Sequence, residues 1–359
     1  MRFGILGAGA IGTVHARLIS SLPEATLSAV ADTDTAAARR LAGAHGCAAL
    51  DSAGDLMTRD DVDAVSVCLP SGLHAKAAVT ALECGKHVVI EKPIDITLAA
   101  ADEIIAAEHR SGRTVTVISQ RRFQPGFRYL HDAAASGQLG RVTLAIAEST
   151  MWRSQDYYDS DGWRGTLALD GGGALMNQGI HTMDLVSWVL GEPVEVMAST
   201  ATLAHQRIEV EDTLVASIRF ASGALATLTA TTGSYPDRPV RLTVTGDAGT
   251  AVVADDRLAY LHTRQTPVGL MPAGSGQADG AGTAGPRGGR ETPAASALRQ
   301  AASPAPVEDA HREQYRDFIA AVRDGRPPAV TTADGRQTLA LVLACYESAR
   351  NGGKPAGVR

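Results

Sequence analysis

Six residues near the start of the chain, Gly7-Ala8-Gly9-Ala10-Ile11-Gly12, have the spacing of a loop that holds a pyrophosphate. Gly7 suits a tight turn, Gly9 lets a phosphate approach the backbone, and Gly12 permits close helix–strand packing. Asp32 follows Gly12 by 20 residues, where an acid accepts hydrogen bonds from ribose hydroxyls. The pattern predicts a dinucleotide site. NAD is expected rather than NADP, because a 2′-phosphate would place a second anion beside Asp32.

A second group of polar residues suits proton transfer. Asn177, His181 and Asp184 stand at i, i+4 and i+7 of an apolar helical pattern, so we expect them on one helix face. Lys92 follows an apolar strand, at the sheet edge where ligands of open α/β folds bind. A structural core histidine and a surface lysine are the alternative interpretations. Asp184 is expected to be a structural acceptor rather than a catalyst.

The elements that must position these residues alternate in type through the first third of the chain. Strand-like runs are expected at 2–6, 27–31, 64–69, 87–90 and 114–119, and helices near 11–22, 35–45, 74–84 and 97–111. Strands that alternate with helices predict right-handed crossovers and a parallel sheet. We therefore expect an α/β Rossmann nucleotide-binding domain over residues 1–121.

The pattern changes in the second part of the chain. Strands are expected at 142–151, 194–202, 212–220, 224–232, 240–245 and 250–254, interrupted by a helix over 174–190. Short turns between consecutive strands predict a large, mainly antiparallel open sheet. This α+β domain, assigned to 122–330, is expected to bind substrate and to mediate oligomerisation. Helices are expected near 308–323 and 334–350, with 331–359 packing back on the body.

Residues 263–307 are rich in Gly, Ala, Pro and Ser and have almost no large apolar side chains. Such a stretch buries too little surface to offset its ordering entropy. The composition predicts a flexible insertion.

Composition narrows the class of protein. Of the 359 residues, 45% are hydrophobic and 20% charged, which predicts a folded core, and the net charge of −6 gives no reason to expect nucleic acid as a partner. No apolar run approaches the ~18 residues of a membrane-spanning helix, and the first residues do not resemble a signal peptide. The four cysteines contain no CxxC pair and are expected to be buried, reduced thiols of a cytoplasmic protein.

Five motifs in order carry a family resemblance. They are the glycine loop followed by His15, then Pro70-Ser71-Gly72-Leu73-His74, Glu91-Lys92-Pro93, Arg121-Arg122-Phe123, and the run from Gly171 through Asn177 and His181 to Asp184. With them the chain resembles the GFO/IDH/MocA oxidoreductases over nearly its whole length except 263–307. The resemblance implies a sugar, an inositol or a related cyclic polyol as substrate.

The resemblance also implies roles for single residues. Lys92 and His181 take the places of the two groups next to the reacting hydroxyl. Many polyol dehydrogenases of the family have Asp where this chain has Asn177, which cannot accept a proton at neutral pH. Ser71 likewise replaces a frequent Asn. The expected cofactor contacts are Gly7, Gly9, Ala10, Ile11, Gly12, Asp32, Pro70, Ser71, His74, Glu91 and Lys92.

Further residues are expected near the substrate. Asn177, Arg121, Trp163 and Arg164 are assigned to substrate binding, the last two by stacking and bidentate hydrogen bonds. Arg122 is an alternative ion-pair partner, and His15 and His74 are balanced between packing and cofactor contact. His181, Asp184 and His205 have no known ligand spacing, and the chain has no HExxH motif, so no metal is predicted.

The sequence therefore predicts an NAD-dependent oxidoreductase that acts on a secondary alcohol or ketone of a sugar or cyclic polyol. Two alternatives stay open. One is an NAD-dependent glycosidase that works by transient oxidation and elimination, and the other is a non-enzymatic NAD(H) sensor.

A homodimer or homotetramer is expected through the face of the second sheet. Its outward positions are expected to be apolar or small, with Ala224, Ala226, Leu228 and Ala230 alternating with Leu225, Thr227 and Thr229. A large neutral face of this kind is seldom left to water.

Overall fold

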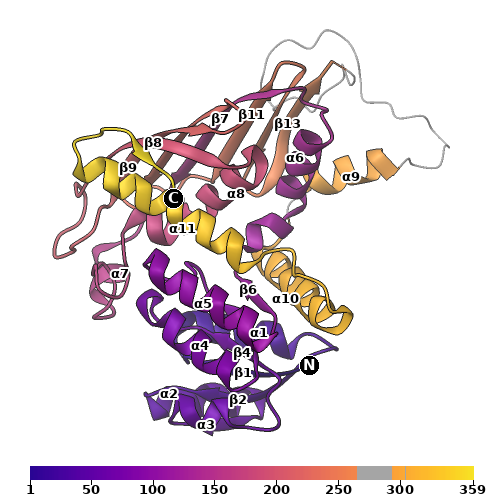
Figure 1. Cartoon of the computed structure of the whole chain (residues 1–359), viewed down its shortest axis with the longest axis vertical. Coiled ribbons are helices and arrows are strands. Elements are labelled where there is room, and N and C mark those ends of the chain that lie inside the picture. The colour runs from indigo at the N-terminus through magenta and orange to yellow at the C-terminus, as the bar shows by residue number, and fades with distance from the viewer. Residues whose placement is uncertain (265–292, 304) are drawn as a thin grey trace.

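The computed structural model describes residues 1–264, 293–303 and 305–359. They form two sheets with helices around and between them (Figure 1). The smaller sheet and its helices contain the N-terminus, and the larger sheet lies at the opposite end of the molecule. None of the described helices is long and apolar enough to cross a membrane.

The first sheet has six parallel strands in the order β3-β2-β1-β4-β5-β6. Its strands are β1 (Arg2–Leu6), β2 (Thr26–Ala31), β3 (Ala48–Leu50), β4 (Ala64–Val67), β5 (His87–Ile90) and β6 (Val115–Val117). The connecting helices are α1 (Ala10–Ser20), α2 (Thr35–His45), α3 (Ala53–Met57), α4 (His74–Glu83) and α5 (Leu98–Ser111). Strand order reverses between β1 and β4, the place where open α/β sheets bind ligands. The predicted Rossmann domain is confirmed.

The second sheet has eight strands in the order β13-β12-β11-β7-β10-β9-β8-β14. They are β7 (Val142–Thr150), β8 (Pro193–Ala201), β9 (Thr213–Phe220), β10 (Leu225–Thr231), β11 (Arg241–Gly246), β12 (Gly249–Ala254), β13 (Arg257–Thr263) and β14 (Ala356–Gly357). Every neighbouring pair is antiparallel except β7 and β10. The mainly antiparallel open sheet is confirmed.

One face of this sheet is covered by α6 (Pro125–Ala135) and α8 (Ile180–Leu190), and α7 (Gln155–Asp159) lies in a connecting loop. The buried side chains of β9 and β10 alternate with exposed ones, as a half-covered sheet requires. The assignment of Ala224, Ala226, Leu228 and Ala230 to the outward face was wrong, because they are at most 2% exposed and pack in the core. Leu225 is 52% exposed and points outward.

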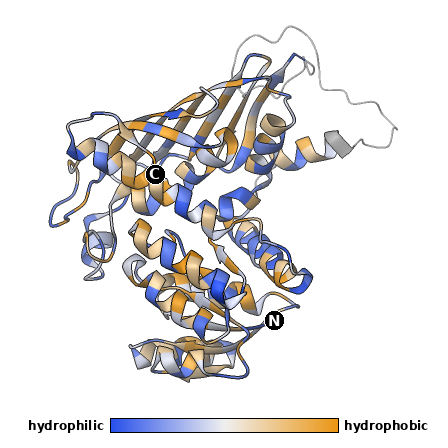
Figure 2. Ribbon diagram, in the orientation of Figure 1, coloured by the Kyte–Doolittle hydropathy of each residue, from blue (hydrophilic) through white to orange (hydrophobic). Residues whose placement is uncertain are grey.

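The C-terminal helices join the two parts. α10 (Val307–Asp324) packs Tyr315, Phe318 and Ile319 into the core around Phe3 of the first sheet, so it belongs with the nucleotide-binding domain rather than with the second domain. Figure 2 shows the rest of this helix as mainly hydrophilic. α11 (Thr332–Arg350) contacts β8, α8 and α5, and therefore lies between the domains.

The expected flexible insertion is partly wrong. Residues 265–292 and 304 lie outside the described residues, but Pro293–Ala302 form helix α9, which contacts α6 and β13. Ala301 is 1% exposed there. Leu298 of the same helix packs against this core beside Ala301, so a single large apolar side chain among small ones is enough for the contact.

The expectation for the cysteines also needs correction. All four are free thiols, but Cys84 is exposed and Cys47 half-buried, so only Cys68 and Cys345 belong to the core.

Candidate active site

The glycine loop between β1 and α1 has the shape that a dinucleotide needs. A Cβ on Gly7, whose φ is +107°, would lie 2.3 Å from the carbonyl oxygen of Cys68, and one on Gly12 would lie 1.9 Å from that of Gly7. A Cβ on Gly9 would meet nothing within 4 Å. Packing therefore requires Gly7 and Gly12, whereas the backbone at Gly9 is open to a ligand, and the exposed Ala10 and half-buried Ile11 begin α1 beside it.

Asp32 at the end of β2 is tied to this loop. Its Oδ2 accepts a hydrogen bond from the backbone N–H of Ala8 at 2.6 Å, and its Oδ1 accepts one from that of Asp34 at 2.8 Å. The carboxylate thus lies beside the loop with acceptor capacity left for hydroxyl groups. The residues present fit a dinucleotide with an unphosphorylated 2′-hydroxyl.

Lys92 follows β5 and reaches across to the second domain. Its Nζ donates a hydrogen bond to the backbone carbonyl of Asn177 at 3.1 Å. Asn177 lies in a π-helical turn, Leu175–Gly179, that directly precedes α8. Such turns shift the hydrogen-bond pattern of a helix and are frequent at functional sites. The turn interrupts the continuous helix predicted over 174–190.

His181 begins α8 and faces the same space. It lines a cavity between the domains together with Lys92, Ser119 and Asp184. Burial lowers the pKa of His181 well below its usual value, and the charges of Lys92 and Arg121 lower it further. No hydrogen bond joins the ring to any other described residue. His181 is therefore a neutral imidazole at pH 7 whose ring nitrogens are available to a substrate.

Asp170 is a residue that the sequence analysis missed. Its Oδ1 accepts a hydrogen bond from Nδ2 of Asn177 at 2.5 Å, and its Oδ2 accepts one from the N–H of Gly165 at 2.8 Å. The carboxyl is buried, which raises its pKa, while these hydrogen bonds and the charge of Lys92 act in the opposite direction. Its place just before Gly171-Gly172-Gly173 was the only available signal.

The second hydrogen on Nδ2 of Asn177 also has a partner, the carbonyl of Gly172 at 3.4 Å. The amide orientation follows, since a flip would set its oxygen against the Asp170 carboxylate. Both N–H groups of the side chain are thus directed away from ligands. Only its Oδ1 remains to interact with a substrate.

The arginines assigned to substrate binding have protein partners. Arg121 forms a half-buried ion pair with Asp256 at 2.7 Å. Arg164 pairs with Asp161 and donates to the hydroxyl of Tyr157. The guanidinium of Arg164 also lies 4.7 Å from the ring centre of Trp163. These contacts hold the two side chains in place.

Arg122 is the ion-pair partner that the sequence offered as an alternative. Its guanidinium makes a bidentate pair with Asp184, at 2.8 and 2.7 Å, and a further ion pair with Asp334 at 3.0 Å. Asp184 is thereby committed to structure, as expected.

The remaining predicted cofactor residues lie in loops beside β4 and β5. Ser71 is buried after the half-buried Pro70, and the next N–H, of Gly72, donates to the carbonyl of Leu169 at 2.9 Å. The buried ring of His74 lies 2.8 Å from each of two backbone carbonyl oxygens, those of Pro93 and Leu69. These two contacts hold the loops together. Glu91 is buried and bonded to His15 at 2.9 Å.

Comparisons with known proteins agree with this geometry. Residues 1–119 match the oxidoreductase family with an NAD-binding Rossmann fold, and residues 127–252 match the GFO/IDH/MocA C-terminal domain. The chain is 30% identical to the uncharacterized oxidoreductase YrbE of Bacillus subtilis over 71% of its length and 74% of that protein. It is 28% identical to myo-inositol 2-dehydrogenase of Thermotoga maritima over 97% of its length and 96% of that enzyme.

A solved structure extends the likeness to the whole chain. The WlbA dehydrogenase of Bordetella pertussis, in complex with NADH and UDP-GlcNAcA, superimposes with a TM-score of 0.83. The two chains are 29% identical, and the match covers 100% of this chain and 98% of that one.

Proposed function

Because the chain belongs to the GFO/IDH/MocA family of NAD-dependent oxidoreductases acting on CH–OH groups, we propose that it oxidises or reduces one secondary alcohol carbon of a sugar or cyclic polyol. The observation that carries the proposal is the neutral ring of His181, which has no hydrogen-bond partner among the described residues and lines the same interdomain cavity as Lys92. NAD⁺, when bound, supplies the hydride acceptor of such a reaction. The names of the relatives, an inositol dehydrogenase and a dehydrogenase with a bound sugar nucleotide, support the substrate class.

The chain's own residues handle the proton. In the oxidation direction the imidazole of His181 accepts the hydroxyl proton, because it is uncharged at neutral pH. Nζ of Lys92, held by the carbonyl of Asn177, retains two further hydrogens for the oxygen of the same hydroxyl. In reduction the roles reverse, and a protonated His181 donates to the nascent alcohol.

Asn177 adds a preference about the neighbouring substrate atom. Since only its Oδ1 remains available, it accepts a hydrogen bond and cannot donate one. The substrate group at this position is therefore a donor, such as the second hydroxyl of a vicinal diol. A carboxylate there would face an acceptor and lose its partner.

A substrate panel tests the proposal. Free sugars, inositols, sugar acids and sugar nucleotides are incubated with NAD⁺ and with NADP⁺, and reduced nicotinamide is followed by absorbance. Formation of NADH with a polyol that contains a vicinal diol supports the proposal. Release of a glycosidic leaving group without net NADH would instead indicate the glycosidase, and NADH binding without turnover of any compound would indicate a sensor.

Removing the carboxylate of Asp32 is expected to weaken NAD⁺ binding. Each lost charge-assisted hydrogen bond to the ribose costs about 1.5–3 kcal/mol, and the preference against NADP⁺ narrows. Calorimetric titration of Asp32→Ala with both nucleotides measures this. Asp34→Ala is the control, because it removes a nearby carboxylate that caps α2 without touching the glycine loop. Equal affinities of Asp32→Ala and the parent for NAD⁺ would remove Asp32 from the ribose site.

Substitutions in the Asp170–Asn177 pair are expected to change how the reaction rate depends on pH. Asn177→Asp alone places two carboxyls in contact, so one of them must take up a proton and its pKa rises. The pH–rate profile then gains an ionisation. The double variant Asp170→Asn/Asn177→Asp restores a single charge and is expected to lose that added ionisation. An unchanged profile in Asn177→Asp would mean that the pair lies outside the active site.

We also propose a homo-oligomer formed through the open face of the large sheet, in a cytoplasmic protein. Exposed apolar side chains continue across four neighbouring strands of this face, namely Leu144, Ile146, Met197, Val215 and Leu225. Single exposed residues are ordinary, but several apolar side chains on one open sheet face favour association. Two copies related by a two-fold axis would cover it in both.

Sedimentation at micromolar concentration tests the oligomer. We expect two or four times the chain mass of 37.2 kDa, and a shift toward the monomer in the double variant Val215→Glu/Leu225→Glu. These side chains are 54% and 52% exposed in the single chain, so the substitutions leave the core intact. A parent that sediments as a single chain would contradict the proposal.

A further inference from the structure

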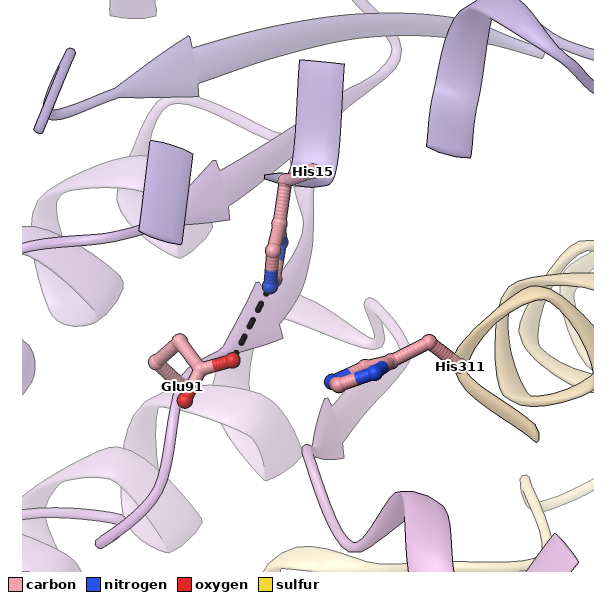
Figure 3. Close-up of side chains that lie close together, drawn as sticks. All are labelled: His15, Glu91 and His311. Atoms are coloured by element: carbon pink, nitrogen blue, oxygen red, sulfur yellow. Dashed lines mark hydrogen bonds and ion pairs between the residues drawn. The ribbon is translucent and has the colours of Figure 1, made fainter. Parts of the chain in front are cut away.

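Three side chains from distant parts of the sequence meet next to the loop that carries Lys92. His15 comes from α1, Glu91 from the end of β5, and His311 from α10 (Figure 3). One donor atom of each lies within 4.8 Å of those of the other two. All three residues are at least 90% buried. Their sequence positions gave no hint of a cluster, and the sequence analysis expected no metal.

One atom of the cluster lacks a partner. Nε2 of His311 is buried and makes no hydrogen bond within the described part of the chain, although Figure 3 shows its ring directed toward the carboxyl of Glu91 and the ring of His15. The other ring nitrogen of His311 is held by the backbone of Val307. The unpartnered nitrogen is therefore a lone pair that faces a carboxylate. Two acceptors face to face need a cation or a donor between them.

We propose that His15, Glu91 and His311 bind one divalent transition-metal ion, zinc by the nature of the donors. The ligands are Nε2 of each histidine and Oε1 of the glutamate. Two imidazoles and a carboxylate are a donor set that zinc takes, with a fourth position left for water. Binding displaces the proton that now joins Nε2 of His15 to Oε1 of Glu91, and that proton passes to solvent.

The surroundings are those of a metal site. Metal-bound histidines as a rule donate their other N–H to an oxygen, which fixes the ring. Nδ1 of His15 lies 2.7 Å from both the hydroxyl of Ser66 and that of Tyr315. The second oxygen of Glu91 accepts from the N–H of Lys92 at 3.0 Å. Each proposed ligand thus has its second polar atom already engaged.

The distances require a small closing movement. In a tetrahedron with zinc bonds of 2.0–2.1 Å, donor atoms are roughly 3.4 Å apart. The ring of His311 must therefore move toward the other two by up to about 1.4 Å, and Nε2 of His15 and Oε1 of Glu91, now 2.9 Å apart, must separate by about 0.5 Å. The bound ion would fasten α10 to the nucleotide-binding domain directly behind Lys92, and so stabilise the loop that carries the proposed active-site lysine.

The test uses the full-length protein, stripped with a chelator and then titrated with ZnCl₂ in a calorimeter. We expect one equivalent to bind and the melting temperature to rise, because an ion that binds only the folded chain stabilises it. His311→Ala is expected to lose both effects. His109→Ala, which removes an exposed histidine of α5, is the control and should retain them.

Two further measurements decide the outcome even if His311→Ala folds poorly. Co²⁺ in place of zinc should give visible absorption bands of a low-coordinate site. Crystals of the parent grown with ZnCl₂ should show an anomalous peak within bonding distance of the three ligands. No zinc equivalent in the parent, zinc bound equally by His311→Ala, or an anomalous peak elsewhere would overturn the proposal and leave a hydrogen-bonded ion pair.

Discussion

Replacing Lys92 by alanine is expected to lower kcat by roughly 10²-fold or more, the usual effect of removing a group that assists proton transfer. The loss has a second signature. The charge of Lys92 is one cause of the lowered pKa of His181, so its removal raises that pKa. The acid limb of the residual activity should then move to higher pH. Stopped-flow or steady-state rates over pH 4–9, with the substrate found by the panel, measure both effects.

Lys92→Arg separates charge from geometry. It keeps the positive charge, so the acid limb should stay where it is in the parent, but a planar guanidinium cannot occupy the place of an ammonium bonded to the carbonyl of Asn177. A reduced kcat with an unmoved acid limb is expected. Lys76→Ala, which removes an exposed lysine of α4, is the surface control. Turnover of Lys92→Ala near that of the parent would exclude the proposed role.

Replacing His181 by alanine is expected to reduce kcat by a similar factor, again about 10²-fold or more. The ring makes no hydrogen bond to another described residue, so the fold loses little. Circular dichroism and the melting temperature should resemble those of the parent. His109→Ala, at an exposed position, is the matched control. A variant that retains parental turnover would remove His181 from the catalytic step.

The lowered pKa of His181 also determines how oxidation activity and stability depend on pH. A base must be unprotonated, and burial keeps the ring neutral well below pH 6.5. The parent should therefore retain oxidation activity down to such pH values and lose it on further acidification. The stability contribution has the same sign. Because the unfolded histidine binds a proton more readily, the contribution is complete above about pH 6.5. It is lost as the pH falls through the lower pKa of the folded state.

Local features of the chain determined much of the fold. The roles of Gly7, Gly9 and Gly12 follow from contacts within one strand–turn–helix unit, and the structure reproduces all three. The helix expected near 97–111 is α5, and Thr97 caps it by accepting a hydrogen bond from the N–H of Ala100. The alternation along β9 separates buried from exposed residues correctly. Such features depend on neighbours a few residues apart, which is the range that sequence periodicity describes.

Which residues contact one another in the candidate active site is harder to predict from sequence periodicity than the fold is. Asp170 stands directly before the glycine triplet in the sequence. Only the folded loop, however, brings its carboxyl to the amide of Asn177. The π-helical turn at 175–179 shifts the hydrogen-bond register that the helical spacing assumed. The outward face of β10 was wrongly assigned for a related reason. Small residues such as Ala226 fit either face, and the covering helix decides between them.

The largest gap concerns contacts between distant segments. His15, Glu91 and His311 lie in three separate elements, and no spacing in the sequence connects them. Their meeting depends on α10 returning across the first sheet, which its apolar side chains Tyr315 and Phe318 bring about by burial against Phe3. The sequence by itself therefore determined the nucleotide loop, the two sheet types and the identity of Lys92 and His181 as candidates. Only the tertiary structure decided which side chains contact Asn177 and Glu91, the neighbours of these two candidates. Such contacts are selected by packing between elements rather than by position along the chain.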